Sequence, residues 1–230
     1  MIIDLILSIW GNKFLIFNRA TKIVASTFGV LVGLAGIEHG IFEMLQGNIA
    51  TTDFMIDAIG SQQKVWEYAS ETALTIIPNF LISGIFAVIF GLLVTIWSGT
   101  FIDKKYGAWI FGLLTVILWL VGGGFAPIFM AVFSFVAATR IRTPLTWWRN
   151  HLSVGIIMYL AKLWAWSIII YTLIFVLGIE IAIFGYPLLW IFNANITYNI
   201  QWSLALIMVI LWPISIITAF ANDIQNGKMI

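Results

Sequence analysis

The chain has 230 residues, of which 62% are hydrophobic and 9% are charged, and its formal net charge is +1. So little polar surface excludes a soluble globule and predicts an all-α, polytopic protein of the cell membrane, with the lipid bilayer as its surroundings. At about 20 residues per crossing, the length allows five to seven helices and no separate catalytic domain. The absence of cysteine excludes disulfides, thiolate ligands and catalytic thiols. The short basic segments form no extended face for nucleic acid, so we expect no such partner.

Residues 1–20 predict a helix that lies in the membrane interface. Asp4 and Ser8 recur at helical spacing among isoleucines and leucines, which is typical of an amphipathic anchor rather than a span. The first membrane span is expected at residues 23–45, directly after the basic residues Arg19 and Lys22.

A polar, acidic loop is expected at residues 46–71, followed by a second span at 73–97. The short link after this span contains Lys104 and Lys105. Because basic flanks favour the cytoplasmic side, we predict that the N-terminus and this link are cytoplasmic and that the acidic loop is outside.

The apolar stretch that follows is interrupted by the triple glycine 122–124. The basic segment after residue 139 is expected on the same, cytoplasmic side as Lys104. The apolar stretch between them must therefore cross the membrane an even number of times. Two short spans at 107–122 and 125–139 meet this requirement, with the glycines as the turn of a hairpin. Each arm reaches only roughly 24 Å, so the hairpin either thins a bilayer core of about 30 Å or is re-entrant.

Two further spans are expected at 152–177 and 200–220, separated by an outer cap at 181–199. The prediction is therefore a single domain of six crossings with both termini cytoplasmic. A cluster of basic and tryptophan residues after the hairpin predicts an anchor to lipid headgroups at the inner leaflet. Its residues are Arg140, Arg142, Trp147, Trp148 and Arg149.

The first span carries a stripe of glycines on one face of the helix. Small residues allow another helix to approach closely, which is the main source of packing between helices in lipid. The stripe predicts a packing seam, within the chain or toward a second copy or other membrane subunits. Its residues are Gly29, Gly33, Gly36, Gly40 and Gly47.

The same span contains Glu38, His39 and Glu43, and a charge at the bilayer centre costs roughly 2.5 to 3.5 kcal/mol. Such groups need partners and mark candidate sites. Glu38 projects away from the glycine seam, and its expected partner is Lys162 of the fifth span. In the alternative, Lys162 lies in the interface and never enters the core.

His39 and Glu43 are one helical turn apart and can share a proton or a metal ion. A third strong ligand is missing, so we expect no metal and no cofactor. Asn79 follows Pro78 and is either a helix-start residue or part of an outer vestibule with Glu43. The triple glycine is either a turn or a backbone nest for an anion.

The sequence lacks a G-x-S-x-G elbow, an H-E-x-x-H motif and paired intramembrane aspartates, so enzymatic activity is not expected. The predicted function is passage or binding of a small solute or ion at a polar intramembrane site. The first alternative is an accessory or scaffold subunit of a larger membrane complex. The second is a lipid-handling membrane enzyme.

Overall fold

The computed structural model describes residues 16–227, and this part of the chain is built almost entirely from α-helices. Residues 1–15, which hold most of the predicted interfacial helix, lie outside the described residues. The predicted all-helical class is confirmed. The helices are α2 (Arg19–Leu45), α3 (Phe80–Thr100), α4 (Gly107–Leu120), α5 (Ala126–Arg140), α6 (Thr146–His151), α7 (Val154–Phe184) and α8 (Ala194–Asn226). Two short strands, β1 (Met55–Asp57) and β2 (Thr72–Leu74), pair antiparallel, and a 3-10 turn, η1, covers Leu188–Trp190.

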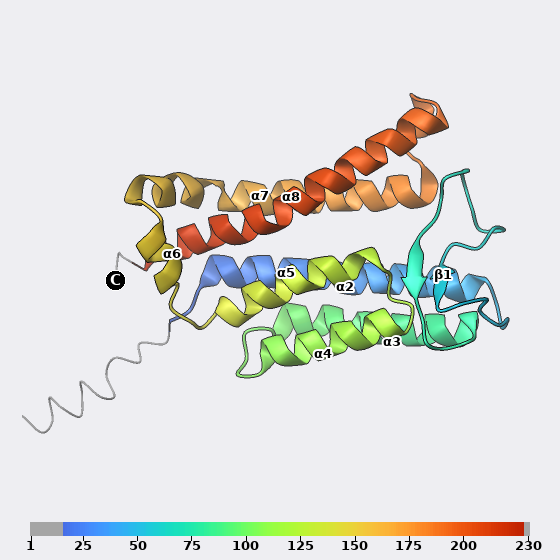
Figure 1. Ribbon diagram of the computed structural model, residues 1–230, viewed down its shortest axis with the longest axis horizontal. Coiled ribbons are helices and arrows are strands. Elements are labelled where there is room, and N and C mark those ends of the chain that lie inside the picture. Colours follow the sequence, from blue (N-terminus) through green and yellow to red (C-terminus); the bar gives the residue numbers. More distant parts are fainter. Residues whose placement is uncertain (1–15, 228–230) are drawn as a thin grey trace, which may run out of the picture.

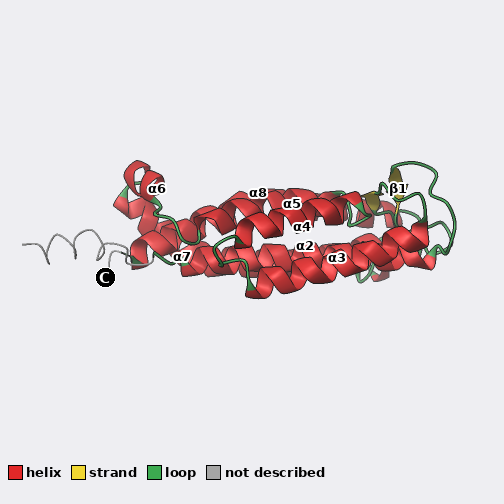
Figure 2. Ribbon diagram, turned by 90° about the horizontal axis from the view of Figure 1, so that it is seen from below, coloured by secondary structure: helices red, strands yellow, loops and turns green. Residues whose placement is uncertain are grey.

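Four helices, α2, α3, α7 and α8, are long and apolar enough to cross a membrane, whereas α4 and α5 have 14 and 15 residues. The long helices and the α4–α5 hairpin run back and forth along one elongated bundle (Figure 1). One layer contains α3, α2 and α7, and the other contains α4, α5 and α8 (Figure 2). We call the end with β1 and β2 the loop end, and the end where α2 begins and α8 finishes the tail end.

Two helix boundaries differ from the sequence prediction because of local capping signals. The second span was predicted to begin at residue 73, but α3 begins at Phe80, and residues 72–74 form β2. Pro78 disfavours helix in the residue before it, and the Asn79 side chain accepts a hydrogen bond from the Ile82 N–H at 3.1 Å, which fixes the start.

The predicted outer cap at 181–199 is mostly helical instead. The apolar run continues α7 to Phe184, and the helix ends at Gly185, whose φ of +72° suits glycine. Asn193 then caps the start of α8 through its side chain. The last two spans are therefore longer than predicted at the loop end, and only residues 185–193 connect them.

Four of the five seam glycines lie against neighbouring helices of the same chain. A Cβ atom at Gly33 would lie 2.6 Å from the carbonyl oxygen of Gly91 in α3, and one at Gly40 would lie 2.6 Å from that of Gly84. Gly29 faces α3 and α4, and Gly36 faces Leu118 of α4. Gly47 does not belong to the seam, because it lies beyond the end of α2 with nothing within 4 Å.

The short α4–α5 hairpin leaves a gap at the loop end that residues 72–76 fill. The Gly122 N–H donates to the Leu74 carbonyl at 2.9 Å, and the Phe125 N–H donates to the Thr72 carbonyl at 2.8 Å. Buried irregular backbone needs hydrogen-bond partners for its polar groups, and residues 72–76 supply them here. The loop after α2 therefore descends onto the glycine turn and completes the bundle.

The tail end is held by polar side chains whose hydrogen-bonding groups have partners. Asp223 of α8 accepts from the N–H groups of Ala20 and Thr21 at 3.0 and 2.8 Å, which satisfies free donors at the start of α2. The amide of Asn18 donates to the Arg140 and Thr143 carbonyls at 2.6 and 3.0 Å.

Asp103, in the turn between α3 and α4, adds an ion-pair cluster to the tail end. It pairs with Lys22 at 3.3 Å and with Arg142 at 3.5 Å. Burial alone would raise the pKa of the Asp103 carboxyl, but the hydrogen bond and charge of Lys22 lower it below its ordinary value. Arg142, one of the residues of the predicted headgroup anchor, thus forms an ion pair within the chain.

Candidate functional site

A cavity of about 600 Å³ opens at the loop end between the α7–α8 pair and the rest of the bundle. Here α8 diverges from α2 and α5 (Figure 1). Its walls come from α2, the start of α5, α7, α8 and residues 67–72 of the loop. The volume falls within the range of about 300 to 1,000 Å³ typical of small-molecule sites. We call it the loop-end cavity.

The deeper part of the cavity is apolar. Met130, Phe175, Met208 and Trp212 contribute side chains here, together with the ring of Tyr171. The Tyr171 hydroxyl donates to the Met130 sulfur at 2.7 Å and accepts from the Trp212 indole N–H at 3.0 Å. The polar atoms of this wall are thereby satisfied, so the surface offered to an occupant is hydrophobic.

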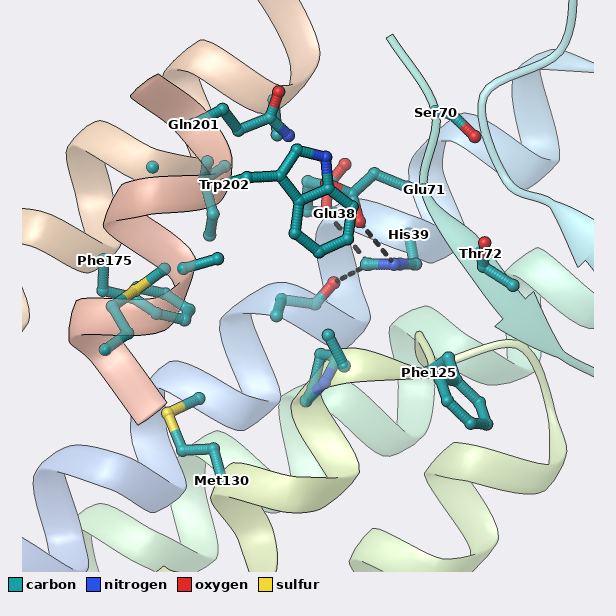
Figure 3. A pocket seen from close by; sticks show the side chains of 18 of the residues that line it. Glu38, His39, Ser70, Glu71, Thr72, Phe125, Met130, Phe175, Gln201 and Trp202 are labelled. Atoms are coloured by element: carbon teal, nitrogen blue, oxygen red, sulfur yellow. Dashed lines mark hydrogen bonds and ion pairs between the residues drawn. The ribbon is translucent and has the colours of Figure 1, made fainter. Parts of the chain in front are cut away.

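The other part of the cavity is polar and centred on His39, which is 2% exposed. The His39 Nδ1 atom lies 2.9 Å from the Ala35 carbonyl and 3.0 Å from Glu38 Oε2. Its Nε2 atom lies 3.4 Å from Glu71 Oε2 (Figure 3). Two carboxylates, one from α2 and one from the loop, therefore flank one imidazole.

Several buried polar atoms at this end have no hydrogen-bond partner among residues 16–227. Within the cavity they are Glu38 Oε1, His39 Nε2 and Gln201 Oε1. A buried acceptor without a partner costs roughly 1 to 3 kcal/mol, so a group of them in one cavity calls for an explanation. Gln201 enters from α8, on the side opposite α2 (Figure 3). The three atoms thus belong to both walls of the cavity.

The triple glycine and the charged residues of α2, treated separately in the sequence analysis, form one structural unit. A Cβ atom at Gly124 would lie 2.7 Å from His39 Nε2, and one at Gly122 would overlap the carboxylate of Glu43. Both glycines have positive φ, +97° and +89° for Gly122 and Gly124. Glycine is therefore needed here for both the turn and the close approach, and the anion-nest interpretation is not needed to explain it.

Glu43 is fully buried beneath this turn, and neither of its carboxylate oxygens has a hydrogen-bond partner among the described residues. The expected His39–Glu43 contact is not formed. His39 pairs instead with the adjacent Glu38, whose long side chain bends back to the ring. Glu43 is not among the residues that line the cavity.

The predicted Glu38–Lys162 pair is wrong. The carbonyl of Ala161, next to Lys162, accepts a hydrogen bond from Asn222 at 3.3 Å, and the adjacent Asp223 caps the start of α2. Lys162 is therefore level with the tail end, whereas Glu38 lies roughly 25 Å further along α2. The Lys162 side chain is exposed on α7.

The remaining predicted residues lie away from the cavity. Asn79 caps α3 and donates to Asn48 Oδ1 at 2.8 Å, so it serves the helix start and not a vestibule with Glu43. Trp147, Trp148 and Arg149 lie on α6 at the tail end. The Trp148 ring packs near Phe220 of α8, with centroids 5.6 Å apart.

Sequence reasoning missed Glu71, Gln201 and the aromatic side chains beside them. Glu71 belongs to a loop that was predicted to stay outside the bundle, and its return onto the cavity has no local sequence signal. Gln201 is a single amide near the start of a long apolar helix. The available clue was the need of Glu38 and His39 for partners, which does not say where those partners are in the sequence.

Among residues 16–227, no group of three or more His, Cys, Asp or Glu side chains has an arrangement suited to a metal ion. The cavity therefore offers one imidazole flanked by carboxylates, an amide and an apolar wall. No family model, no curated protein and no solved structure matches the chain, so any functional conclusion depends on this geometry.

Proposed function

We propose that the protein binds a small amphipathic solute within the membrane, in the loop-end cavity. The observation that carries this proposal is the combination of an apolar wall around Tyr171 with unpartnered polar atoms around His39 in one cavity. An occupant with a polar head and an apolar tail would satisfy both parts at once. The proposal keeps the predicted location in the cell membrane, with six crossings and the tail end cytoplasmic.

Binding is favoured over passage by the packing below the cavity. Phe28, Phe111, Met130 and Tyr171 are each at most 1% exposed and belong to one continuous hydrophobic core. The Phe28 and Tyr171 rings are in edge contact, with centroids 4.8 Å apart. A dense core of this kind supports a closed inner end rather than an open pathway.

The scaffold alternative has less support. It requires the glycine seam of α2 for partner helices, and this seam is occupied by α3 and α4 of the same chain. The lipid-enzyme alternative, with His39 as a general base, requires a hydroxyl or thiol beside the ring, and the side chains paired with its nitrogens are the carboxylates of Glu38 and Glu71.

The test is equilibrium dialysis of the protein in lipid nanodiscs against octyl amphiphiles that differ only in the head group. The probes are octylammonium, octyltrimethylammonium, octyl sulfate and octyl glucoside, and uptake by empty nanodiscs is subtracted. At least one probe is expected to bind saturably, with about one molecule per chain.

A pair of variants on α8 locates the bound probe. Ala205 lines the cavity, so Ala205→Phe fills it and is expected to abolish saturable binding. The neighbouring Leu206 is 65% exposed and does not line the cavity, so Leu206→Phe is the matched control. Equal binding by both variants, or no saturable binding of any probe, contradicts the proposed function.

A further inference from the structure

We infer that the occupant of the loop-end cavity carries a protonated amine whose N–H groups are bound by Glu38 and Gln201. This inference rests on the proposed function and specifies the chemical class of the ligand head group. It follows from three features of the polar part of the cavity: its charge, its unpartnered atoms and its aromatic side chains.

The charge of the polar part is negative. Glu38, Glu67 and Glu71 line it, and the described lining residues contain no Lys or Arg. His39 is the single basic group among them, so its protonation leaves two negative charges uncompensated. In a poorly hydrated cavity such an excess attracts a cation and disfavours an anionic head group.

The polar atoms without a hydrogen-bond partner favour the same kind of ligand as the negative charge does. Glu38 Oε1 and Gln201 Oε1 are hydrogen-bond acceptors. At His39, oxygen atoms lie beside both ring nitrogens, the Ala35 carbonyl and Glu38 Oε2 at Nδ1 and Glu71 Oε2 at Nε2. Nε2 faces a carboxylate, which only accepts hydrogen bonds, so the ring donates at this position and is not counted among the acceptors for a ligand.

Two unpartnered acceptors, Glu38 Oε1 and Gln201 Oε1, suit a primary ammonium group, which has three N–H donors. The two acceptors come from α2 and α8, so an ammonium group between them would connect the two walls where α8 diverges (Figure 3). Glu71, which lies 3.4 Å from Nε2, adds negative charge beside this position. A quaternary ammonium has the same charge but no N–H group to donate.

Aromatic rings complete the polar part. Tyr68, Tyr198 and Trp202 line it, with Tyr68 and Tyr198 stacked at a centroid distance of 4.6 Å. The Tyr198 and Trp202 rings are in edge arrangement at 6.2 Å. Aromatic faces attract cations by roughly 0.5 to 2 kcal/mol, so these rings favour the same head group as the carboxylates.

The same dialysis experiment tests the inference through the order of the four probes. Octylammonium is expected to bind at least about 10-fold more tightly than the other three, because charged hydrogen bonds are lost with each of them. Equal or tighter binding of octyltrimethylammonium overturns the role of the N–H donors. Equal or tighter binding of octyl sulfate or octyl glucoside overturns the cationic head group while leaving the proposed function intact.

Variants then assign the acceptors. Glu38→Gln and Gln201→Leu are each expected to weaken octylammonium binding about 10-fold, with little change for octyl glucoside. Glu180→Gln is the matched control, because Glu180 is exposed on α7 close to the cavity and does not line it. If Glu180→Gln weakens binding as much as Glu38→Gln does, general electrostatics explains the effect and the assignment is wrong. An unchanged thermal midpoint in detergent establishes that each variant is folded.

Discussion

The two ends of the bundle use polar residues in opposite ways. At the tail end, Asp223, Asp103 and Asn18 have hydrogen-bond or ion-pair partners that join helices distant in the sequence. At the loop end, Glu38 Oε1 and Gln201 Oε1 are buried with no hydrogen-bond partner among residues 16–227. Satisfied polar groups stabilise a fold, whereas unsatisfied ones destabilise it unless a ligand completes them. The difference separates a structural end from the end where we propose that a ligand binds, which we call the binding end.

The largest effect on stability is expected at the glycine turn that supports the binding end. Gly122→Ala places a methyl group on the Glu43 carboxylate in a residue with positive φ, and these two costs together amount to about 2 to 5 kcal/mol. The measurement is the thermal midpoint in detergent. Glu43→Ala removes the overlap, so the double variant is expected to recover part of this loss.

Gly47→Ala is the control that separates the two costs. Gly47 also has a positive φ, +88°, but nothing lies within 4 Å of its Cβ position. The Gly47→Ala variant is expected to lose only the stability that a positive φ costs, about 1 to 2 kcal/mol. Equal losses at Gly122 and Gly47, with no recovery by Glu43→Ala, would show that the turn does not press on Glu43.

The next effect is expected at the α2–α3 contact, which joins both ends of the bundle. Gly33→Ala brings Cβ to 2.6 Å from the Gly91 carbonyl oxygen, a backbone atom that cannot rotate away. A loss of about 1 to 3 kcal/mol is expected in thermal unfolding. Gly155→Ala in α7 meets open space and is expected to be neutral or slightly stabilising, and a similar loss there would argue against the seam.

A smaller and pH-dependent effect is expected at the tail end. Because the pKa of Asp103 is lowered in the folded protein, its pairing with Lys22 stabilises the fold above the ordinary pKa of 3.8 and is lost as the pH falls below it. Asp103→Asn should therefore lower the thermal midpoint at about pH 6, and the difference from wild type should shrink toward about pH 2. A difference that does not change with pH would mean that charge at Asp103 is unimportant.

Composition and helical periodicity were sufficient to predict the helical class and the approximate helices, because apolar length determines a span. The ends of α3 and α7 were missed where Asn79 and Gly185 act as caps, since an apolar run alone does not show where a helix stops. Glu38 and His39 were predicted as site residues because placing ionisable groups in lipid costs free energy. The pairing of His39 with Glu71 and the approach of Gln201 to the same cavity could not be predicted, because they depend on the tertiary arrangement of a loop and a distant helix.

The contrast between the two ends is tested most directly by one pair of thermal unfolding measurements without ligand, on Asn18→Leu and Gln201→Leu. Asn18 is satisfied by two carbonyl groups, so its loss is expected to cost about 1 to 3 kcal/mol. Gln201 has an unpartnered buried oxygen, so its replacement is expected to leave stability unchanged or to raise it. A comparable loss at both positions would contradict the account, because the loop-end amide would then be structural as well.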